Sequence, residues 1–253
     1  MFTINHLIWM LICVVVVAVA TNYLRKHGTP LRSLLNVACV MCVCSELIKT
    51  FSAFKMVPSA DGSVMFPYIE LQHLPLHLCS LQIILIFYVR FAKESAFREM
   101  LLAFMYPTCL IGAALAIAMP SIFPESIDVS QAFTHPLAYQ YFLYHAMLVT
   151  LGIHIAFSGQ VNIRRKHYFT TMGILGVLAF LSLYVNSIFS SPTYLNGELV
   201  SVDYTPNLFF TYEPPIPIAL TELWHWYLYL CVILALGFGL IALFYIPFFR
   251  KKN

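Results

Sequence analysis

The sequence predicts an all-α membrane protein: a single domain over residues 1–253 with seven transmembrane helices, its N-terminus outside and its C-terminus in the cytoplasm. Its 253 residues are 60% hydrophobic and only 10% charged, with a mean hydropathy of +0.81. Soluble domains usually carry about 25% charged residues. Apolar runs of about 20 residues, the length of a membrane-spanning helix, recur along the chain. Basic residues gather in alternate loops, and this gives the orientation.

Each apolar run is long enough for one span, and turn-rich or charged segments separate the runs. The predicted spans are 5–24, 34–54, 73–92, 99–119, 138–158, 168–190 and 219–247. The first run lacks a basic start and is followed by no small-residue cleavage site. We therefore expect no cleavable signal peptide.

The loops alternate in charge across all seven spans. One set carries the basic residues Arg25, Lys26, Arg32, Arg90, Lys93, Arg98, Arg164, Arg165, Lys166, Arg250, Lys251 and Lys252. The opposite set carries Asp61, Glu70, Glu125, Asp128, Glu198, Asp203 and Glu213, with Lys55 against them. Short basic loops stay in the cytoplasm, so the first set is predicted to be cytoplasmic.

The outer segment 191–218 is rich in proline, glycine and aromatic residues. Proline and glycine at this density argue against a helix or a central strand. Its tyrosine and phenylalanine side chains suit a membrane interface. We expect this extracytoplasmic loop to lie over the outer mouth of the helix bundle.

Polar residues recur at one depth in the predicted spans, about 5–12 Å below the outer interface at about 1.5 Å per residue. Ionisable groups inside a membrane are costly and are therefore functional candidates. The candidates on five spans are Glu46, Cys79, His145, Asn186, Glu222 and His225. They predict a polar pocket open to the outer leaflet. The alternative for Glu46 is a structural ion pair with Lys49, three residues later.

The stretch HLPLHLCS, residues 73–80, carries two histidines and a cysteine at the start of the third span. Pro75 suits the first turn of a helix, so the helix should begin near His73, with Cys79 just over one turn inside. His73 and His77 would then share a face, and His77 would lie about 200° around the helix from Cys79.

A base for the Cys79 thiol should therefore come from another span, and His145 is at matching depth. A cysteine near a helix N-terminus and an imidazole can ionise and attack an ester carbonyl. The alternative is that Cys79 and His145 only pack as small apolar and hydrogen-bonded residues.

HLPLHLCS resembles the LPLHLC signature of the bacterial YwaF-like integral membrane proteins, which are related to animal transmembrane protein 164. PNLFFTYEPPIPIALTELWHWY at 206–227, which contains Asn207, and YFLYHAML around His145 are similar to two further family segments. Leu208 stands where the family usually has tyrosine, and His225 where it often has proline.

The resemblance implies a seven-helix fold in the bacterial plasma membrane. From the animal branch it implies acyl transfer between phospholipids, with a catalytic cysteine and histidine that correspond to Cys79 and His145. His77, Glu46, Asn186, Asn207, Glu222 and His225 would bind the substrate or support the pair.

Three functions remain open from sequence. The first is a lipid acyltransferase or transacylase without a cofactor, with membrane phospholipid as its substrate. The second is a metal-dependent membrane lipid hydrolase with ligands from His73, His77, His145, His225 and Glu222. The third is a non-enzymatic seven-helix lipid-binding or sensor protein. The few basic residues outside short loops argue against nucleic acid as a partner. The oligomeric state stays open.

Overall fold

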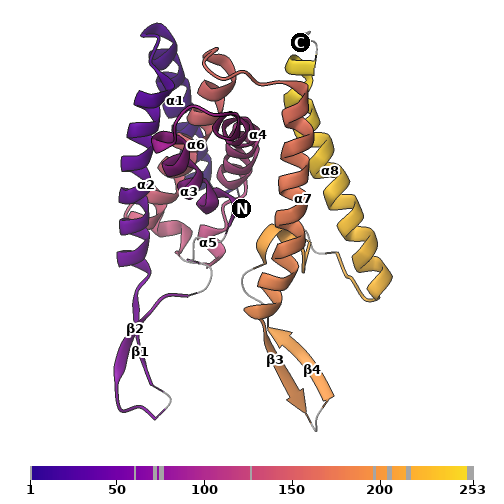
Figure 1. Ribbon diagram of the computed structural model, residues 1–253. Helices are drawn as coiled ribbons and strands as arrows, with labels where there is room; N and C mark the ends of the chain where they lie inside the picture. The colour runs from indigo at the N-terminus through magenta and orange to yellow at the C-terminus, as the bar shows by residue number, and fades with distance from the viewer. Residues whose placement is uncertain are drawn as a thin grey trace. The chain divides into compact units, whose positions relative to one another are not determined.

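The computed structural model describes residues 2–59, 61–70, 73, 77–125, 127–195, 198–203, 207–214 and 218–249 (Figure 1). The chain divides into two compact units. The first comprises Met1–Ile69 with Leu78–Ile163, and the second comprises Glu70–His77 with Arg164–Asn253. Each unit is described here by itself, and the single domain expected above stays a prediction.

The first unit is a helix bundle built around one central helix. Its long helices are α1 (Ile4–Lys26), α2 (Leu31–Ala53), α3 (Leu78–Phe91), α4 (Ala96–Ala118) and α6 (Pro136–Phe157), with a short α5 (Ile122–Glu125) and a 3₁₀ turn, η2 (Val129–Gln131), before α6. Helix α6 packs against α1, α2 and α4, and α3 packs against α2 and α4. Because α4 and α6 are surrounded by other helices, they bury apolar residues on most of their faces.

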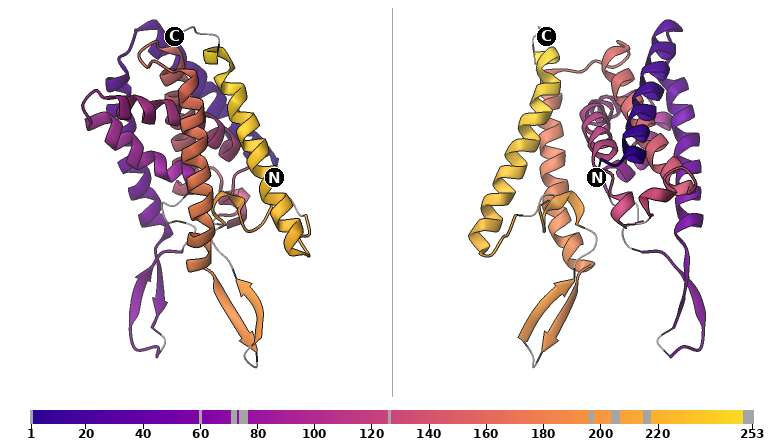
Figure 2. Two further views of the ribbon diagram at one scale, coloured as in Figure 1. Left: turned by 45° about the vertical axis from the view of Figure 1, so that its right-hand side comes forward. Right: turned by 180° about the vertical axis from the view of Figure 1, so that it is seen from behind.

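The second unit is a helix pair with an irregular connection. It contains α7 (Arg165–Ile188), the strands β3 (Ser191–Leu195) and β4 (Glu198–Asp203), a 3₁₀ turn η3 (Leu208–Phe210) and α8 (Leu223–Phe249). Helices α7 and α8 lie side by side in all views (Figures 1 and 2). The hydroxyl groups of Thr171 and Tyr245 are hydrogen-bonded across this pair at 3.0 Å.

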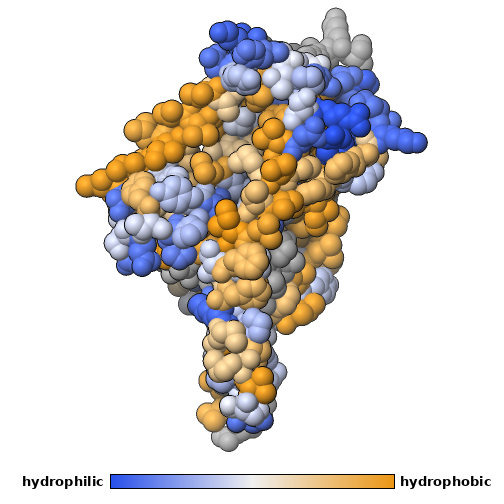
Figure 3. Space-filling view, turned by 90° about the vertical axis from the view of Figure 1, so that its left-hand side faces the viewer, coloured by the Kyte–Doolittle hydropathy of each residue, from blue (hydrophilic) through white to orange (hydrophobic). Residues whose placement is uncertain are grey.

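Helices occupy all seven predicted spans within the described residues. Six of them are long and apolar enough to cross a membrane, and α3 is a shorter apolar helix of 14 residues. The face in Figure 3 is largely hydrophobic, with hydrophilic residues gathered at its upper end. Apolar side chains that cover the outside of long helices suit contact with lipid, so the chain is a multi-pass helical membrane protein.

The predicted start of the third span is wrong. We expected 73–92, but α3 begins at Leu78, so Cys79 lies in its first turn instead of just over one turn inside. His73 and His77 precede the helix and do not share a helical face. The expected role of Pro75 at the helix start lies outside the described residues.

Both long connections of the predicted outer side contain a two-stranded antiparallel hairpin. The strands β1 (Lys55–Pro58) and β2 (Met65–Tyr68) form one, and β3 and β4 form the other. In the first, the side chains of Ser59 and Ser63 and the Ser63 backbone N–H donate to the Asp61 carboxylate, which lowers the pKa of Asp61 to about 2. Residues 191–218 were predicted to contain no central strand. The second hairpin is compatible with this, because each strand of a two-stranded sheet is an edge strand. The 3₁₀ turn η3 is a short helix that the proline content did not predict.

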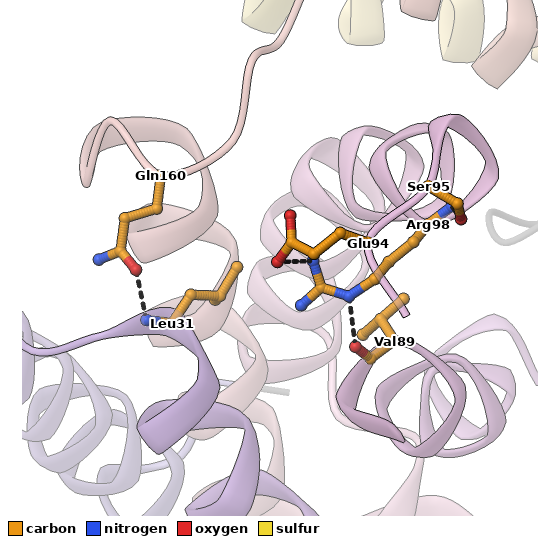
Figure 4. A network of polar contacts seen from close by, with 6 residues as sticks. All are labelled: Leu31, Val89, Glu94, Ser95, Arg98 and Gln160. Carbon is orange, nitrogen blue, oxygen red and sulfur yellow. Dashed lines mark hydrogen bonds and ion pairs between the residues drawn. The ribbon is translucent and has the colours of Figure 1, made fainter. Parts of the chain in front are cut away.

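Polar contacts hold the loops at one end of the first unit (Figure 4). Gln160, just after α6, accepts from the Leu31 backbone N–H at 2.6 Å and donates to the Thr29 carbonyl at 3.0 Å. It caps the N-terminus of α2, where Pro30 offers no side-chain cap. Across the turn between α3 and α4, Arg98 donates to the Val89 carbonyl at 2.7 Å.

Gly152 sets the close approach of α4 and α6. A Cβ atom there would lie 2.8 Å from Cγ of Leu110 and 3.0 Å from the backbone oxygen of Tyr106. We expect Gly152→Ala to lower the stability of the bundle by about 1–3 kcal/mol, because the backbone of α4 must move away. The measurement is thermal unfolding of the purified protein in detergent.

The matched control for this substitution is Gly176→Ala in α7, where an added Cβ meets no atom within 4 Å. Alanine is the better helix former, so this change should leave stability equal or raise it by up to about 1 kcal/mol. Equal unfolding temperatures for Gly152→Ala and the wild type would contradict a tight contact at Gly152.

Candidate catalytic site

Cys79 lies where three helices of the first unit meet. Its side chain is partly buried in the first turn of α3. Its Sγ atom lies 3.5 Å from the position that a Cβ on Gly112 of α4 would take. The Tyr144 hydroxyl of α6 donates to the Cys79 backbone carbonyl at 2.7 Å. The thiol is therefore held against the bare backbone of α4, and the start of α3 is tied to α6.

His145 is held in one orientation in the middle of α6. It is only 7% exposed, and its Nδ1 lies 2.7 Å from the backbone carbonyl oxygen of Tyr141. Because a carbonyl only accepts, Nδ1 must carry the hydrogen, and Nε2 of the neutral ring keeps its lone pair. The rings of Tyr141 and Tyr144 lie beside the imidazole, with centroids at 4.4 and 5.5 Å. This tautomer has the acceptor atom that a general base needs.

The packing of α4 against α6 relates the position of His145 to that of Cys79. The Tyr141 hydroxyl donates to the Ala116 carbonyl of α4 at 3.0 Å. The two helices run antiparallel, so one turn further along α6 from Tyr141 corresponds to one turn back along α4 from Ala116. These steps lead to His145 and to Gly112, which the Cys79 Sγ faces. These contacts place Cys79 beside α4 and His145 one turn from the Tyr141–Ala116 contact, and the pairing of the two side chains stays a prediction.

In the described part of the chain, the Cys79 thiol makes no hydrogen bond to His145. Catalytic hydrogen bonds are often long or misaligned in a protein without substrate and tighten only when substrate binds. A catalytic pair of Cys79 and His145 therefore stays a prediction.

A groove between α2 and α3 reaches the level of Cys79. Its cavity of about 320 Å³ is lined by Cys42, Val43, Glu46, Leu47, Thr50, Phe51, Phe54, Ile83 and Phe87. Arg90 of α3 donates to the Asn36 side chain of α2. In an antiparallel pair, this contact brings Cys79 level with Leu47. The apolar walls of this α2–α3 groove suit a hydrocarbon chain.

Glu46 forms an ion pair with Lys49, which was the structural alternative to a role in the polar pocket. The Lys49 Nζ lies 2.7 Å from a carboxylate oxygen of Glu46. Glu46 also lines the α2–α3 groove. The pair neutralises both charges within the apolar helix.

Gln82 and Tyr144 are candidate supporting residues that the sequence did not single out. Gln82 is fully buried, and its side-chain amide donates to the Thr108 hydroxyl at 2.9 Å. Its Oε1 atom has no hydrogen-bond partner among the described residues. A buried acceptor three residues from Cys79 is costly unless something pairs with it. Gln82 could have been singled out from the sequence, because it is the one glutamine in the apolar run of α3.

Asn186 and Asn207 have structural roles in the second unit. The Asn186 side chain is 0% exposed, donates to Thr211 Oγ1 at 2.9 Å and accepts from the Leu208 backbone N–H at 3.0 Å. The Asn207 side chain donates to the Glu213 carbonyl at 2.8 Å and accepts from the Tyr212 N–H at 3.1 Å. Together they fold residues 207–214 onto α7.

Glu222 and His225 stand at the start of α8. The His225 ring nitrogen Nδ1 lies 3.3 Å from the Thr221 hydroxyl. Among the hydrogen bonds of the described residues, none joins the Glu222 carboxylate to the His225 ring. His77 is exposed in the bend just before α3. The polar pocket predicted from residues of both units stays a prediction.

The described residues contain no group of three or more His, Cys, Asp or Glu side chains arranged to hold a metal ion. The pair His73 and His77, which was attractive for zinc as a helical i, i+4 pair, precedes α3 and lacks that geometry.

Comparison with protein-family models gives one match, to the model described as the TMEM164 family, over residues 1–245. Neither the curated proteins nor the solved structures contain a match to this chain. The match covers all the helices except the last four residues of α8, and it includes the start of α3 and the whole of α6.

Proposed function

This chain belongs to the TMEM164 family, and from that membership we propose that it is a membrane-embedded lipid acyltransferase or transacylase with Cys79 as nucleophile and His145 as general base. The observation that supports the proposal is that Sγ of Cys79 lies beside Gly112 of α4, while His145 of the adjoining α6 has Nε2 available as an acceptor. The substrate class is the membrane phospholipid.

The first half of the reaction forms a thioester. Nε2 of His145 takes the thiol proton, and Sγ of Cys79 attacks the carbonyl carbon of a phospholipid ester. The bond between that carbon and the ester oxygen breaks. His145 gives its proton to the leaving alkoxide, so a lyso-lipid departs with a neutral hydroxyl.

The second half of the reaction transfers the acyl group to an acceptor and restores the free thiol of Cys79. His145 removes a proton from the hydroxyl of an acceptor lipid, and the resulting oxygen attacks the thioester carbonyl. The C–S bond breaks, and Cys79 recovers its proton from His145. The α2–α3 groove would hold the acyl chain through both halves, which lets the lyso-lipid leave while the chain stays bound.

The proposal includes the membrane arrangement. Seven spans, an external N-terminus and a cytoplasmic C-terminus in the bacterial plasma membrane would place the N-terminus of α3 toward the outer leaflet. The alternation of basic and acidic loops supports this orientation. A phospholipid ester of the outer leaflet would then approach Cys79 sideways from the bilayer.

The experiment is intact-protein mass spectrometry of the wild type in detergent after incubation with a diacyl phospholipid of defined chains. We expect a mass increase of one acyl group that hydroxylamine removes, since hydroxylamine cleaves thioesters. Peptide mapping should place this group on Cys79, and heat-denatured protein is the control. No adduct and no acyl transfer with phosphatidylethanolamine, phosphatidylglycerol or cardiolipin would overturn the proposal.

A further inference from the structure

A second groove lies on the first unit, between α1, α4 and α6. Its cavity of about 590 Å³ is the size of a small-molecule site. Its walls are apolar along most of their length and include Met10, Val14, Ala18, Ala114 and Val149. From Met10 to Arg25 it follows α1 for about 22 Å at 1.5 Å per residue. This α1–α4–α6 groove shares no lining residue with the α2–α3 groove near Cys79.

The polar residues of this groove are confined to one end. They are Thr21, Asn22 and Arg25, in the last two turns of α1. The Thr21 hydroxyl is buried and has no hydrogen-bond partner among the described residues. Neither Asn22 nor Arg25 has a side-chain hydrogen bond or ion pair within those residues, and no acidic residue lines the groove. Two exposed groups able to donate, the Asn22 amide and the Arg25 guanidinium, thus lie at the end of an apolar channel.

We propose that this groove binds a phospholipid, with an acyl chain along its apolar walls and the phosphate at Arg25. The phosphate oxygens are acceptors only, and they match the two exposed donors at this end, the Arg25 guanidinium and the Asn22 amide. An apolar helix from a partner protein would fill the walls but leave the Arg25 guanidinium without a counter-charge. The site is independent of the acyl-transfer chemistry at Cys79.

The length of the groove agrees with this occupant. The hydrocarbon core of a bilayer is about 30 Å thick, so each leaflet contributes about 15 Å of chain and then the headgroup layer. A groove of about 22 Å with its cation at one end matches one leaflet with its phosphate. Arg25 belongs to a basic loop, where anionic headgroups are attracted to the protein.

The test is native mass spectrometry of the full chain in detergent, with dioleoylphosphatidylglycerol and, as the control without phosphate, dioleoylglycerol. We expect the wild type to retain one phosphatidylglycerol more tightly than the diacylglycerol. Arg25→Gln should weaken retention about tenfold or more through loss of a charge-assisted contact. Its matched control is Lys26→Gln, which removes the same charge at the next residue, outside the groove lining.

A steric pair of variants separates the groove from the general surface. Ala18→Trp should fill the cavity and abolish the tight retention, whereas Val19→Trp, on the exposed side of α1, should leave it unchanged. Cys79→Ala should bind as the wild type does, so failure here is distinguishable from failure of the acyltransferase.

Three results would overturn the proposal. If Arg25→Gln and Lys26→Gln weaken phosphatidylglycerol retention equally, the lipid is held by general attraction to the basic loop and not by a site at Arg25. Equal retention of diacylglycerol and phosphatidylglycerol would mean that no phosphate is recognised. A lipid-free dimer that Ala18→Trp dissociates would mean that a second copy occupies the groove.

Discussion

Cys79→Ala should abolish phospholipid acyl transfer and the hydroxylamine-sensitive mass increase while leaving the protein folded. The substitution removes the only atom that forms the thioester in the proposed reaction. It leaves the Cys79 carbonyl, so the hydrogen bond from Tyr144 that anchors the start of α3 remains. The readouts are transfer of a labelled acyl chain between phospholipids, intact mass and the unfolding temperature.

The matched control for Cys79→Ala is Cys44→Ala, which removes an exposed thiol from α2. We expect full transfer activity and an unchanged adduct for this variant. Cys109→Ala is a second comparison. Because Cys109 is fully buried, this substitution should lower the unfolding temperature more than it lowers the rate of acyl transfer. A Cys79→Ala protein that still transfers acyl chains at the wild-type rate would exclude the cysteine mechanism, whatever its stability.

His145→Ala should slow thioester formation at Cys79 by about 10²–10⁴-fold, the usual contribution of a positioned general base. The adduct should still appear, because the thiol is present, but only after long incubation. Raising the pH should partly restore the rate in this variant, since a larger thiolate fraction reduces the need for a base. The measurement is the time course of the mass increase at several pH values.

His154→Ala is the control on the same helix. His154 is also a mostly buried histidine of α6, but it lies nine residues further along and outside the depth predicted for Cys79. It should change stability more than the rate of acylation. Equal rates for His145→Ala and the wild type across the pH range would show that His145 only packs between Tyr141 and Tyr144.

The helices were predictable from sequence because each span depends on a local property, the length of an apolar run. Cys79 and His145 were assigned to one depth for the same reason, and the structure places them on α3 and α6, each of which packs against α4. The start of α3 was not predictable from Pro75, because a proline that suits a first turn does not require one.

The supporting residues were harder to predict, because their roles depend on which helices are neighbours. Tyr144 matters through its contact with α3, and Gln82 through its contact with Thr108 of α4. Asn186 had the depth of a site residue, yet its hydrogen bonds all go to the 207–214 segment of its own unit. Periodicity within one helix carries no information on such pairings.

The shortness of α3 has a consequence for the bilayer around it. Its 14 residues rise about 21 Å, against a hydrocarbon core of about 30 Å. A helix this short creates a hydrophobic mismatch, which the surrounding lipid relieves by thinning. The first-turn N–H groups of α3 also need acceptors that hydrocarbon cannot supply. In the proposed orientation, headgroups and water would be drawn down to the level of Cys79, where the ester bond of a lipid would meet the thiol.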